Sequence, residues 1–195
     1  MKTFLLARHG ESLLNVAGTV NADPELDPGL SERGEGEAHD LGLQLAGIEI
    51  DLAVTSRFPR ARQTAAIALT GRDVPHVVLP ELDDVRVGEL EGRTIAEYRA
   101  WKHGRAPSEP FPGGESLDDA AARYAGAYRS LLDRRERTVL VVCHEIPVRY
   151  AINAAARSEH LDAPVHDVRN AIPYLFDEGG LAAAAARIAG LASAR

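Results

Sequence analysis

The chain has 195 residues, 45% of them hydrophobic, and a formal net charge of −7. This size and composition are typical of one soluble globular domain, so we expect a single domain over residues 1–195. The 22 basic residues are scattered rather than gathered in a stripe, which argues against nucleic acid or an anionic membrane as the main partner.

Two further features bear on the compartment. Cys143 is the only cysteine, so an internal disulfide is impossible, and a buried structural role is favoured over a reactive thiol. The apolar run near the start ends at Arg8 after about four residues, short of the roughly 7–15 that a signal peptide needs. We therefore expect a cytoplasmic protein without a membrane span.

Apolar, β-branched runs alternate with helical patterns along the chain, which indicates βα units around a largely parallel sheet. The predicted strands are Thr3–Ala7, Leu52–Thr55, Val77–Leu79, Thr138–Cys143 and Ala171–Phe176.

Four helices are predicted from apolar spacing and N-terminal signals. The first begins after Ser31 and carries Ala38, Leu41, Leu45 and Ile48 on one face, and the others run from Pro59 to Leu69, from Ser116 through Leu131, and over Leu181–Leu191. The proline- and glycine-rich stretch 106–114 is predicted to be a loop, which could lie over a site.

The first predicted strand delivers Arg8, His9 and Gly10 at its end, where open α/β sheets build their active sites. Arginine offers donors matched to phosphate oxygens, and histidine can be a nucleophile at neutral pH. Glycine allows a ligand to approach the backbone closely. These residues alone are only moderately specific for a phosphate site.

Two later segments strengthen the phosphate interpretation. Arg60 lies in the segment that opens the Pro59 helix, where free N–H groups and the helix dipole attract anions, although an exposed amphipathic helix is the alternative. His144 ends the predicted strand Thr138–Cys143, and its alternative role is that of a hydrogen-bonded core histidine. Together with Arg8 and His9, these segments compose one possible phosphate site.

The three segments resemble those of the histidine phosphatase superfamily, also called phosphoglycerate mutase-like. The matching stretches are LLARHGESLLN, TSRFPRARQTA and VLVVCHEIPVR, with further similarity in LSERGEGEA, LDDVRVGELEGRTIAEY and PGGESLDD, up to about Phe176. The resemblance implies a three-layer αβα sandwich with a Rossmann-like, largely parallel sheet. It also implies phosphoryl transfer through a phosphohistidine without a metal or other cofactor.

Carried over by position, the resemblance makes His9 the nucleophile and places Arg8, Arg60 and His144 around the phosphoryl group. Asn15 matches a polar position of the phosphate pocket. The glutamate that usually donates a proton falls at Asp84.

This set of residues is chemically sufficient without a metal. Two guanidinium groups and a second imidazole can stabilise the charge that phosphoryl transfer spreads over three oxygens. The arginines also disfavour the imidazolium form of His9 and so keep it nucleophilic. A carboxylic acid can protonate the leaving group and then activate the water that hydrolyses the phosphohistidine. No spacing among the remaining histidines suggests a metal site.

Three positions depart from the family pattern. Asp84 is one methylene shorter than glutamate, and Asp83, Glu81 or Glu89 could take its place as the acid. Glu145 stands where glycine is common, and it could repel an anionic substrate or pair with an arginine. Arg57 replaces a common proline and is the alternative clamp residue to Arg60.

The favoured function is a phosphatase for a small phosphorylated metabolite, acting as a monomer or homodimer. A phosphoglycerate-type mutase is the second candidate, but the segment Gly92–Glu115 is short and lacks the basic cluster of such mutases. A slow or non-catalytic module that binds phosphorylated ligands is the third, suggested by Asp84 and Glu145.

Overall fold

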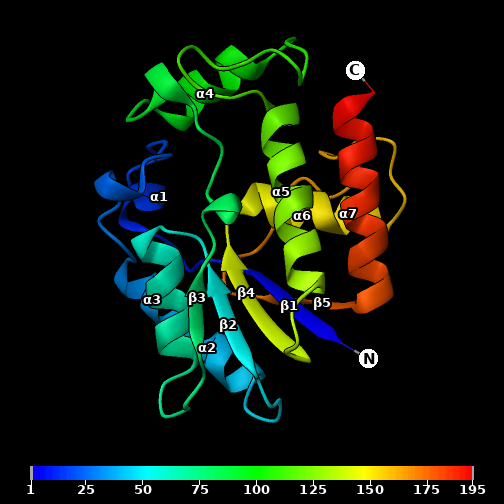
Figure 1. Cartoon of the computed structure of the whole chain (residues 1–195). Coiled ribbons are helices and arrows are strands. Elements are labelled where there is room, and N and C mark those ends of the chain that lie inside the picture. The colour runs from blue at the N-terminus through cyan, green and yellow to red at the C-terminus, as the bar shows by residue number, and fades with distance from the viewer. Residues whose placement is uncertain (1, 195) are drawn as a thin grey trace.

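The computed structural model describes residues 2–194, and its centre is a five-stranded sheet in the order β3-β2-β4-β1-β5. The strands are β1 (Thr3–Arg8), β2 (Leu52–Thr55), β3 (His76–Val78), β4 (Thr138–Cys143) and β5 (Pro173–Asp177) (Figure 1). Four strands are parallel, and the edge strand β5 runs antiparallel to β1. This mixed but largely parallel sheet confirms the predicted fold class.

Helices cover both faces of the sheet, which makes three layers. One face carries α2 (Glu32–Gln44) and α3 (Pro59–Ala68), and the other carries α5 (Leu117–Leu132), α6 (Glu145–Ala155) and α7 (Glu178–Ser193). Side chains of β1 alternate between the two cores, with Phe4 and Leu6 packed on the α5 side and Leu5 on the α2 side. Burial on both faces explains why the central strands are continuous apolar runs.

The predicted helices form, and their first residues follow the expected capping chemistry. The Ser31 side chain accepts a hydrogen bond from the backbone of Gly34 at the start of α2, and Ser116 forms a capping box with Asp119 at the start of α5. The terminal helix is confirmed as α7, capped by Asp177. Helix α2 ends at Gln44, so Ile48 lies beyond it.

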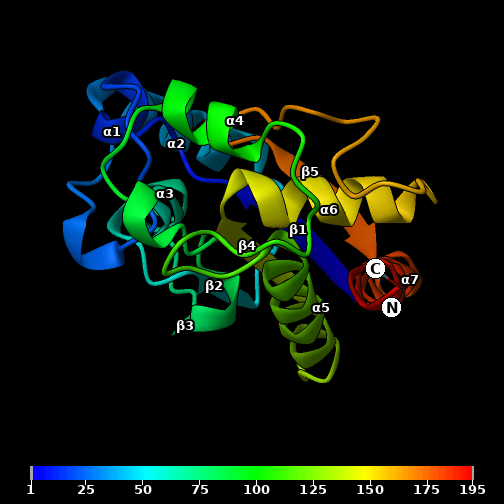
Figure 2. The ribbon, with the colours of Figure 1, turned by 90° about the horizontal axis from the view of Figure 1, so that it is seen from above.

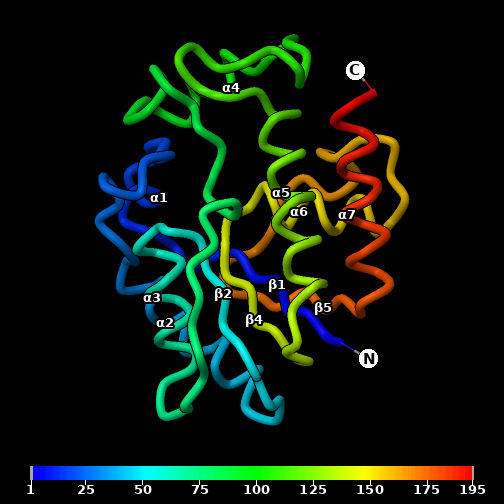
Figure 3. Tube along the Cα trace, in the orientation of Figure 1, coloured from blue at the N-terminus to red at the C-terminus, as the bar shows by residue number. Residues whose placement is uncertain are grey.

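The structure also contains helices that the sequence patterns did not predict. They are α1 (Leu13–Val16), α4 (Ile95–Lys102), α6, and the 3-10 turns η1 (Pro24–Leu26), η2 (Pro80–Leu82) and η3 (Gly88–Leu90). After β3 the chain leads away from the sheet to α4, and it then returns to α5 (Figure 3). Strand β5 begins later than predicted because Ala171 has a φ of +50°, which is not an extended conformation.

The carboxyl ends of β1, β2 and β4 lie at one edge of the sheet, as their parallel registers require. In Figure 2, which looks down on the molecule, α1, α4 and α6 lie around this region. None of the helices in residues 2–194 is long and apolar enough to cross a membrane.

Candidate active site

The side chains that follow β1, β2 and β4 meet at this edge, beside a cavity of about 330 Å³. Its walls come from the β1 end, the loop after α1, α3, the loop after η2, α4 and α6. Polar residues on them are Arg8, His9, Asn15, Thr19, Asn21, Arg60, Asp84, Tyr98, Arg99, Lys102, Glu145, Arg149 and His166. Of the predicted site residues, only His144 is not in the lining, because its ring lies fully buried just behind it.

His9 is 3% exposed, and both of its ring nitrogens have partners. Nδ1 lies 2.7 Å from the Gly10 carbonyl oxygen, while Arg60 Nε donates to Nε2 at 3.0 Å. Nδ1 must therefore carry the proton, and Nε2 holds the lone pair. Burial, reinforced by Arg60 and Arg8, lowers the pKa of His9 well below its usual range. His9 is thus a neutral imidazole at neutral pH.

Gly10 has a different role from the one its sequence position suggested. A Cβ on Gly10 would lie 2.4 Å from the backbone oxygen of Gly34 in the first turn of α2. The glycine therefore permits two backbone segments to pack closely, rather than a ligand to approach.

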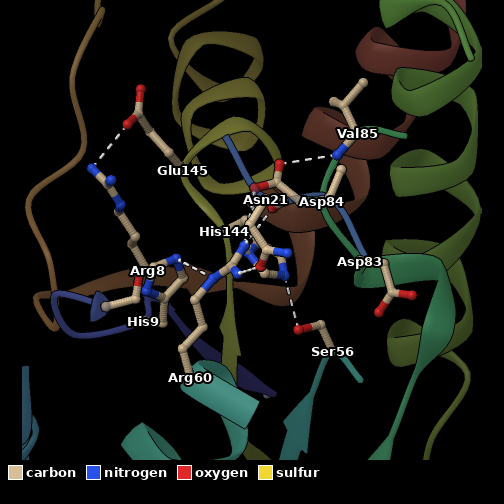
Figure 4. Close-up of polar contacts among 12 residues, drawn as sticks. Arg8, His9, Asn21, Ser56, Arg60, Asp83, Asp84, Val85, His144 and Glu145 are labelled. Carbon is tan, nitrogen blue, oxygen red and sulfur yellow. Dashed lines mark hydrogen bonds and ion pairs between the residues drawn. The ribbon is translucent and has the colours of Figure 1, made fainter. Parts of the chain in front are cut away.

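Arg60 is the centre of the polar network in Figure 4. Besides His9, its guanidinium donates to the side-chain oxygen of Asn21 and contacts His144 Nδ1 at 3.2 Å. Asp27, with a fully buried carboxylate, accepts from the Arg60 backbone N–H at 2.9 Å and pairs with its Nη1 at 3.5 Å. This acidic partner occupies the start of α3, so that helix terminus is not free to bind phosphate as the sequence had suggested.

His144 lies against His9, with the ring centroids 5.3 Å apart and nearly perpendicular. Its Nε2 is 2.9 Å from Ser56 Oγ, and its Nδ1 faces Arg60. Since arginine can only donate, Nδ1 accepts and Nε2 donates to Ser56. Burial, with Arg60 the next cause, lowers the pKa of His144 well below its usual range. The Phe58 ring packs edge-on against this imidazole and beneath Arg60.

Arg8 reaches from the end of β1 toward α6. Its Nη1 lies 2.8 Å from Glu145 Oε2 and 3.0 Å from the carbonyl oxygen of Val168. Its Nε is buried and lacks a hydrogen-bond partner among the described residues. A buried guanidinium N–H without an acceptor is costly, so a ligand oxygen is the natural partner for this edge.

Asp84 is the acidic residue of its loop that lines the cavity. Its Oδ2 lies 3.4 Å from Arg60 Nη2 and 3.5 Å from His144 Nδ1, and burial raises the pKa of this carboxyl. The alternatives lie elsewhere. Asp83 is held by the Arg57 side chain at 2.6 Å, and Glu81 and Glu89 are exposed.

Two predicted residues take less central positions. Asn15 lines the cavity, but its side chain accepts a hydrogen bond from the Ser12 backbone in the capping box of α1. Arg57, the alternative clamp residue, is bound to Asp83 and lies outside this cavity. Arg60 is therefore the arginine of this segment that reaches His9.

Sequence reasoning missed several residues that hold the network together, namely Asn21, Asp27, Ser56 and Phe58. Ser56 alone had a usable signal, because it directly follows a buried strand, as His9 and His144 do. His166, one of the remaining histidines to which the sequence assigned no role, also lines the cavity. Within residues 2–194, no group of three or more His, Cys, Asp or Glu side chains is arranged to hold a metal ion.

Comparison with known proteins agrees with this geometry. The family model for the histidine phosphatase superfamily (branch 1) matches residues 4–175. A 2,3-bisphosphoglycerate-dependent phosphoglycerate mutase from Brucella ovis is 34% identical over 170 residues, covering 78% of this chain and 81% of the mutase.

Solved structures give the same result. YhfR of Bacillus stearothermophilus superposes with a TM-score of 0.81 at 30% identity, covering 91% of each chain. The putative alpha-ribazole-5'-P phosphatase of Escherichia coli gives 0.78 at 27% identity, again covering 91% of each chain. A mycobacterial glucosyl-3-phosphoglycerate phosphatase, solved with VO3, gives 0.74 at 25% identity, covering 91% of this chain and 93% of the other.

Proposed function

Because the chain belongs to the histidine phosphatase superfamily (branch 1) and so is an enzyme that acts on phosphomonoesters, we propose that it hydrolyses a small phosphorylated metabolite through a phosphohistidine on His9. The observation that carries the proposal is the neutral, buried His9, with its Nε2 lone pair turned toward Arg60.

The first step is attack by His9 Nε2 on phosphorus. The hydrogen bond from Nδ1 to Gly10 holds the ring in the tautomer that leaves Nε2 free of a proton. Arg60 Nε now bonds to this nitrogen, and a phosphoryl oxygen would take over that donor and release the lone pair. The Nε2–P bond forms as the bond from phosphorus to the alcohol oxygen breaks.

Arg8, Arg60 and His144 stabilise the charge on the three phosphoryl oxygens. The buried Nε of Arg8 finds an acceptor there, and Arg60 supplies donors already aligned by Asn21 and Asp27. The incoming anion offsets the lowered pKa of His144, so Nδ1 takes up a proton from solvent as the ligand binds and donates a hydrogen bond to a phosphoryl oxygen. Asn15 lines the same cavity.

Asp84 supplies the proton that the departing alkoxide needs. Its raised pKa keeps a fraction of it protonated, and its exposed fraction of 27% leaves it open to the cavity. After transfer, the carboxylate activates water for attack on the phosphohistidine, which restores His9. No step requires a metal ion.

A mutase is the second candidate, favoured by the 34% identity to the Brucella enzyme. A mutase would return the phosphoryl group from His9 to another hydroxyl of the substrate rather than to water. The two reactions share the same first step and differ in the acceptor.

The test measures phosphate release from a panel of phosphomonoesters in the presence of EDTA, together with trapping of the intermediate by rapid quenching in alkali. We expect sustained phosphate release and an acid-labile phosphate on His9, both lost in His9→Ala. Isomerisation of 3-phosphoglycerate without phosphate release would establish the mutase. Ligand binding without a labelled His9 would leave only a binding module.

A further inference from the structure

Glu145 is the first residue of α6 and lies on the cavity wall, where it contacts two cations. Its Oε2 is 2.8 Å from Arg8 Nη1, and its Oε1 is 2.7 Å from Arg149 Nη1. The side chain is 29% exposed, so the carboxylate is held between the two arginines and still faces the cavity. In Figure 4, Glu145 lies at the left beside Arg8, and Asp84 lies at the right beside Val85.

The contact with Arg8 uses only one end of the guanidinium. Nη1 is taken by Glu145 and Val168, while the buried Nε lacks a partner among the described residues. The Arg8 guanidinium, which binds the phosphoryl group through Nε in the proposed function, is therefore also paired with the Glu145 carboxylate through Nη1. A substrate atom attached next to the phosphate ester would be close to that carboxylate.

Most other cations along this wall are already paired, with the exception of Arg99. Arg149 is bound by Glu145 and, at 2.8 Å, by Asp162, which also holds Lys102 at 3.0 Å. Arg99 lines the cavity from exposed α4 without an ion pair among residues 2–194, and it is the cation that a more distant anion could reach. Next to the phosphate position, a second anion would meet Glu145 rather than a free cation.

We propose that Glu145 is a specificity-determining residue that selects phosphomonoesters whose alcohol is uncharged next to the phosphate, and disfavours those that carry a carboxylate or second phosphate there. The inference rests on the proposed function for its phosphoryl position. Its physical basis is that like charges brought together in a partly desolvated site repel strongly, which is how sites reject a wrong partner. Apolar residues of the same cavity, Val20, Val87, Ile95 and Ile146, suit an uncharged alcohol.

The test uses glycerol 3-phosphate and 3-phosphoglycerate, which share a three-carbon skeleton and differ in a CH₂OH group against a carboxylate. We expect the unmodified enzyme to prefer glycerol 3-phosphate in kcat/KM. Glu145→Gln keeps the shape and one of the two acceptor oxygens but removes the charge, so it should narrow that preference by about 10-fold or more, equivalent to about 1.4 kcal/mol. The change should lie mainly in the KM for 3-phosphoglycerate.

A ratio of two substrates cancels any common effect of the substitution on Arg8. Asp167→Asn is the matched control, since Asp167 lies 3.8 Å from the same Arg8 nitrogen but is 84% exposed, so its charge is screened by water. We expect it to leave the ratio unchanged.

An unchanged ratio in Glu145→Gln, or an equal change in Asp167→Asn, would refute the selectivity role while leaving the phosphatase intact. A preference of the unmodified enzyme for 3-phosphoglycerate would refute it too. If neither compound releases phosphate, the same ratio is read from their dissociation constants measured by calorimetry, and the proposed function fails only if no phosphomonoester of the wider panel releases phosphate.

Discussion

At the residue scale, the site is a set of buried groups in which each charge is held by another. Arg60 joins both histidines, and its own charge is balanced by Asp27 and Asp84. This mutual bonding fixes the geometry before a substrate arrives, and such preorganisation is a main source of charge stabilisation in enzymes.

The residues predicted from the sequence, Arg8, His9, Arg60 and His144, are brought together at one edge of the sheet. They were recognisable because each stands at a strand end or helix start within a motif. Asn21 and Asp27 were not, because they lie in the connection between α1 and α2, where no periodic pattern marks a side chain that faces inward. Their roles follow only from the three-dimensional positions of their partners.

Asp84→Asn tests the proposed acid. We expect a loss of roughly 10²–10⁴ in rate on an alkyl phosphate, whose alkoxide needs a proton, and a much smaller loss on p-nitrophenyl phosphate, whose leaving group does not. Steady-state kinetics on both substrates give the measurement.

Glu81→Gln is the control for Asp84→Asn, since it removes an exposed charge from the same loop. If Glu81→Gln instead loses much more rate on the alkyl phosphate than on p-nitrophenyl phosphate, Glu81 is the proton donor. Equal losses on the two substrates for Asp84→Asn would limit Asp84 to structure or to the hydrolysis of phosphohistidine.

Arg60→Ala tests the clamp. Loss of one preorganised donor commonly costs roughly 10²–10³ in rate, so we expect a fall in kcat/KM of about that size. Arg62→Ala is the matched control, because Arg62 is exposed on the same helix. Similar activities of the two variants would show that Arg60 does not act on the phosphoryl group.

At the element scale, the helices with clear caps and regular apolar spacing were predictable, and the others were not. Helix α6 follows β4 after one residue and has Pro147 in its first turn, so no loop or capping side chain marks where the strand ends and the helix begins. Helix α4 has only partly buried or exposed residues and therefore no strong apolar face. Helix α7 was predicted from its alanine-rich sequence, and it packs on α5 and α6, the helix that begins beside His144.

Leu181→Ala tests how much α7 contributes to the fold. Leu181 is fully buried in the core shared with α5, so its truncation should reduce the free energy of unfolding by roughly 2–5 kcal/mol. Leu175→Ala on β5 removes the same atoms from a side chain that is 69% exposed. It should change the free energy of unfolding by less than about 0.5 kcal/mol. Urea unfolding measures both, and equal effects would mean that α7 is not tightly packed.

At the scale of the whole molecule, alternating strands and helices predicted a layered α/β fold, and the structure has it. The strand order could not be predicted from the sequence pattern, because apolar runs such as β1 and β4 contain no feature that indicates which strands they pair with. The order determines which side chains form the candidate site, since the β2-β4-β1 arrangement places Ser56, His144 and His9 side by side. The fold therefore buries two histidines at the carboxyl ends of its central strands, β1 and β4.

That burial makes the stability of the whole fold depend on pH. The pKa values of His9 and His144 are lowered well below 6.5, the value expected in the unfolded chain. As pH falls below about 6.5, the two histidines bind protons in the unfolded state but not in the folded state. Their contribution to the free energy of unfolding is therefore complete above that pH and is lost below it. The loss is up to about 1.4 kcal/mol per pH unit for each histidine. Asp84, whose raised pKa lets the folded state take up a proton first, offsets part of this loss.

We expect the free energy of unfolding, measured in urea, to be lower at pH 5.5 than at pH 7.5. His144→Asn should reduce the difference between the two pH values, because it removes one of the two histidines responsible. Each variant is compared with itself at the two pH values, so any general destabilisation cancels. His39→Asn, at an exposed position on α2, is the matched control and should retain the full difference. If His144→Asn retains it as well, the acid sensitivity of the fold must come from other groups, and His144 is not held neutral by its burial.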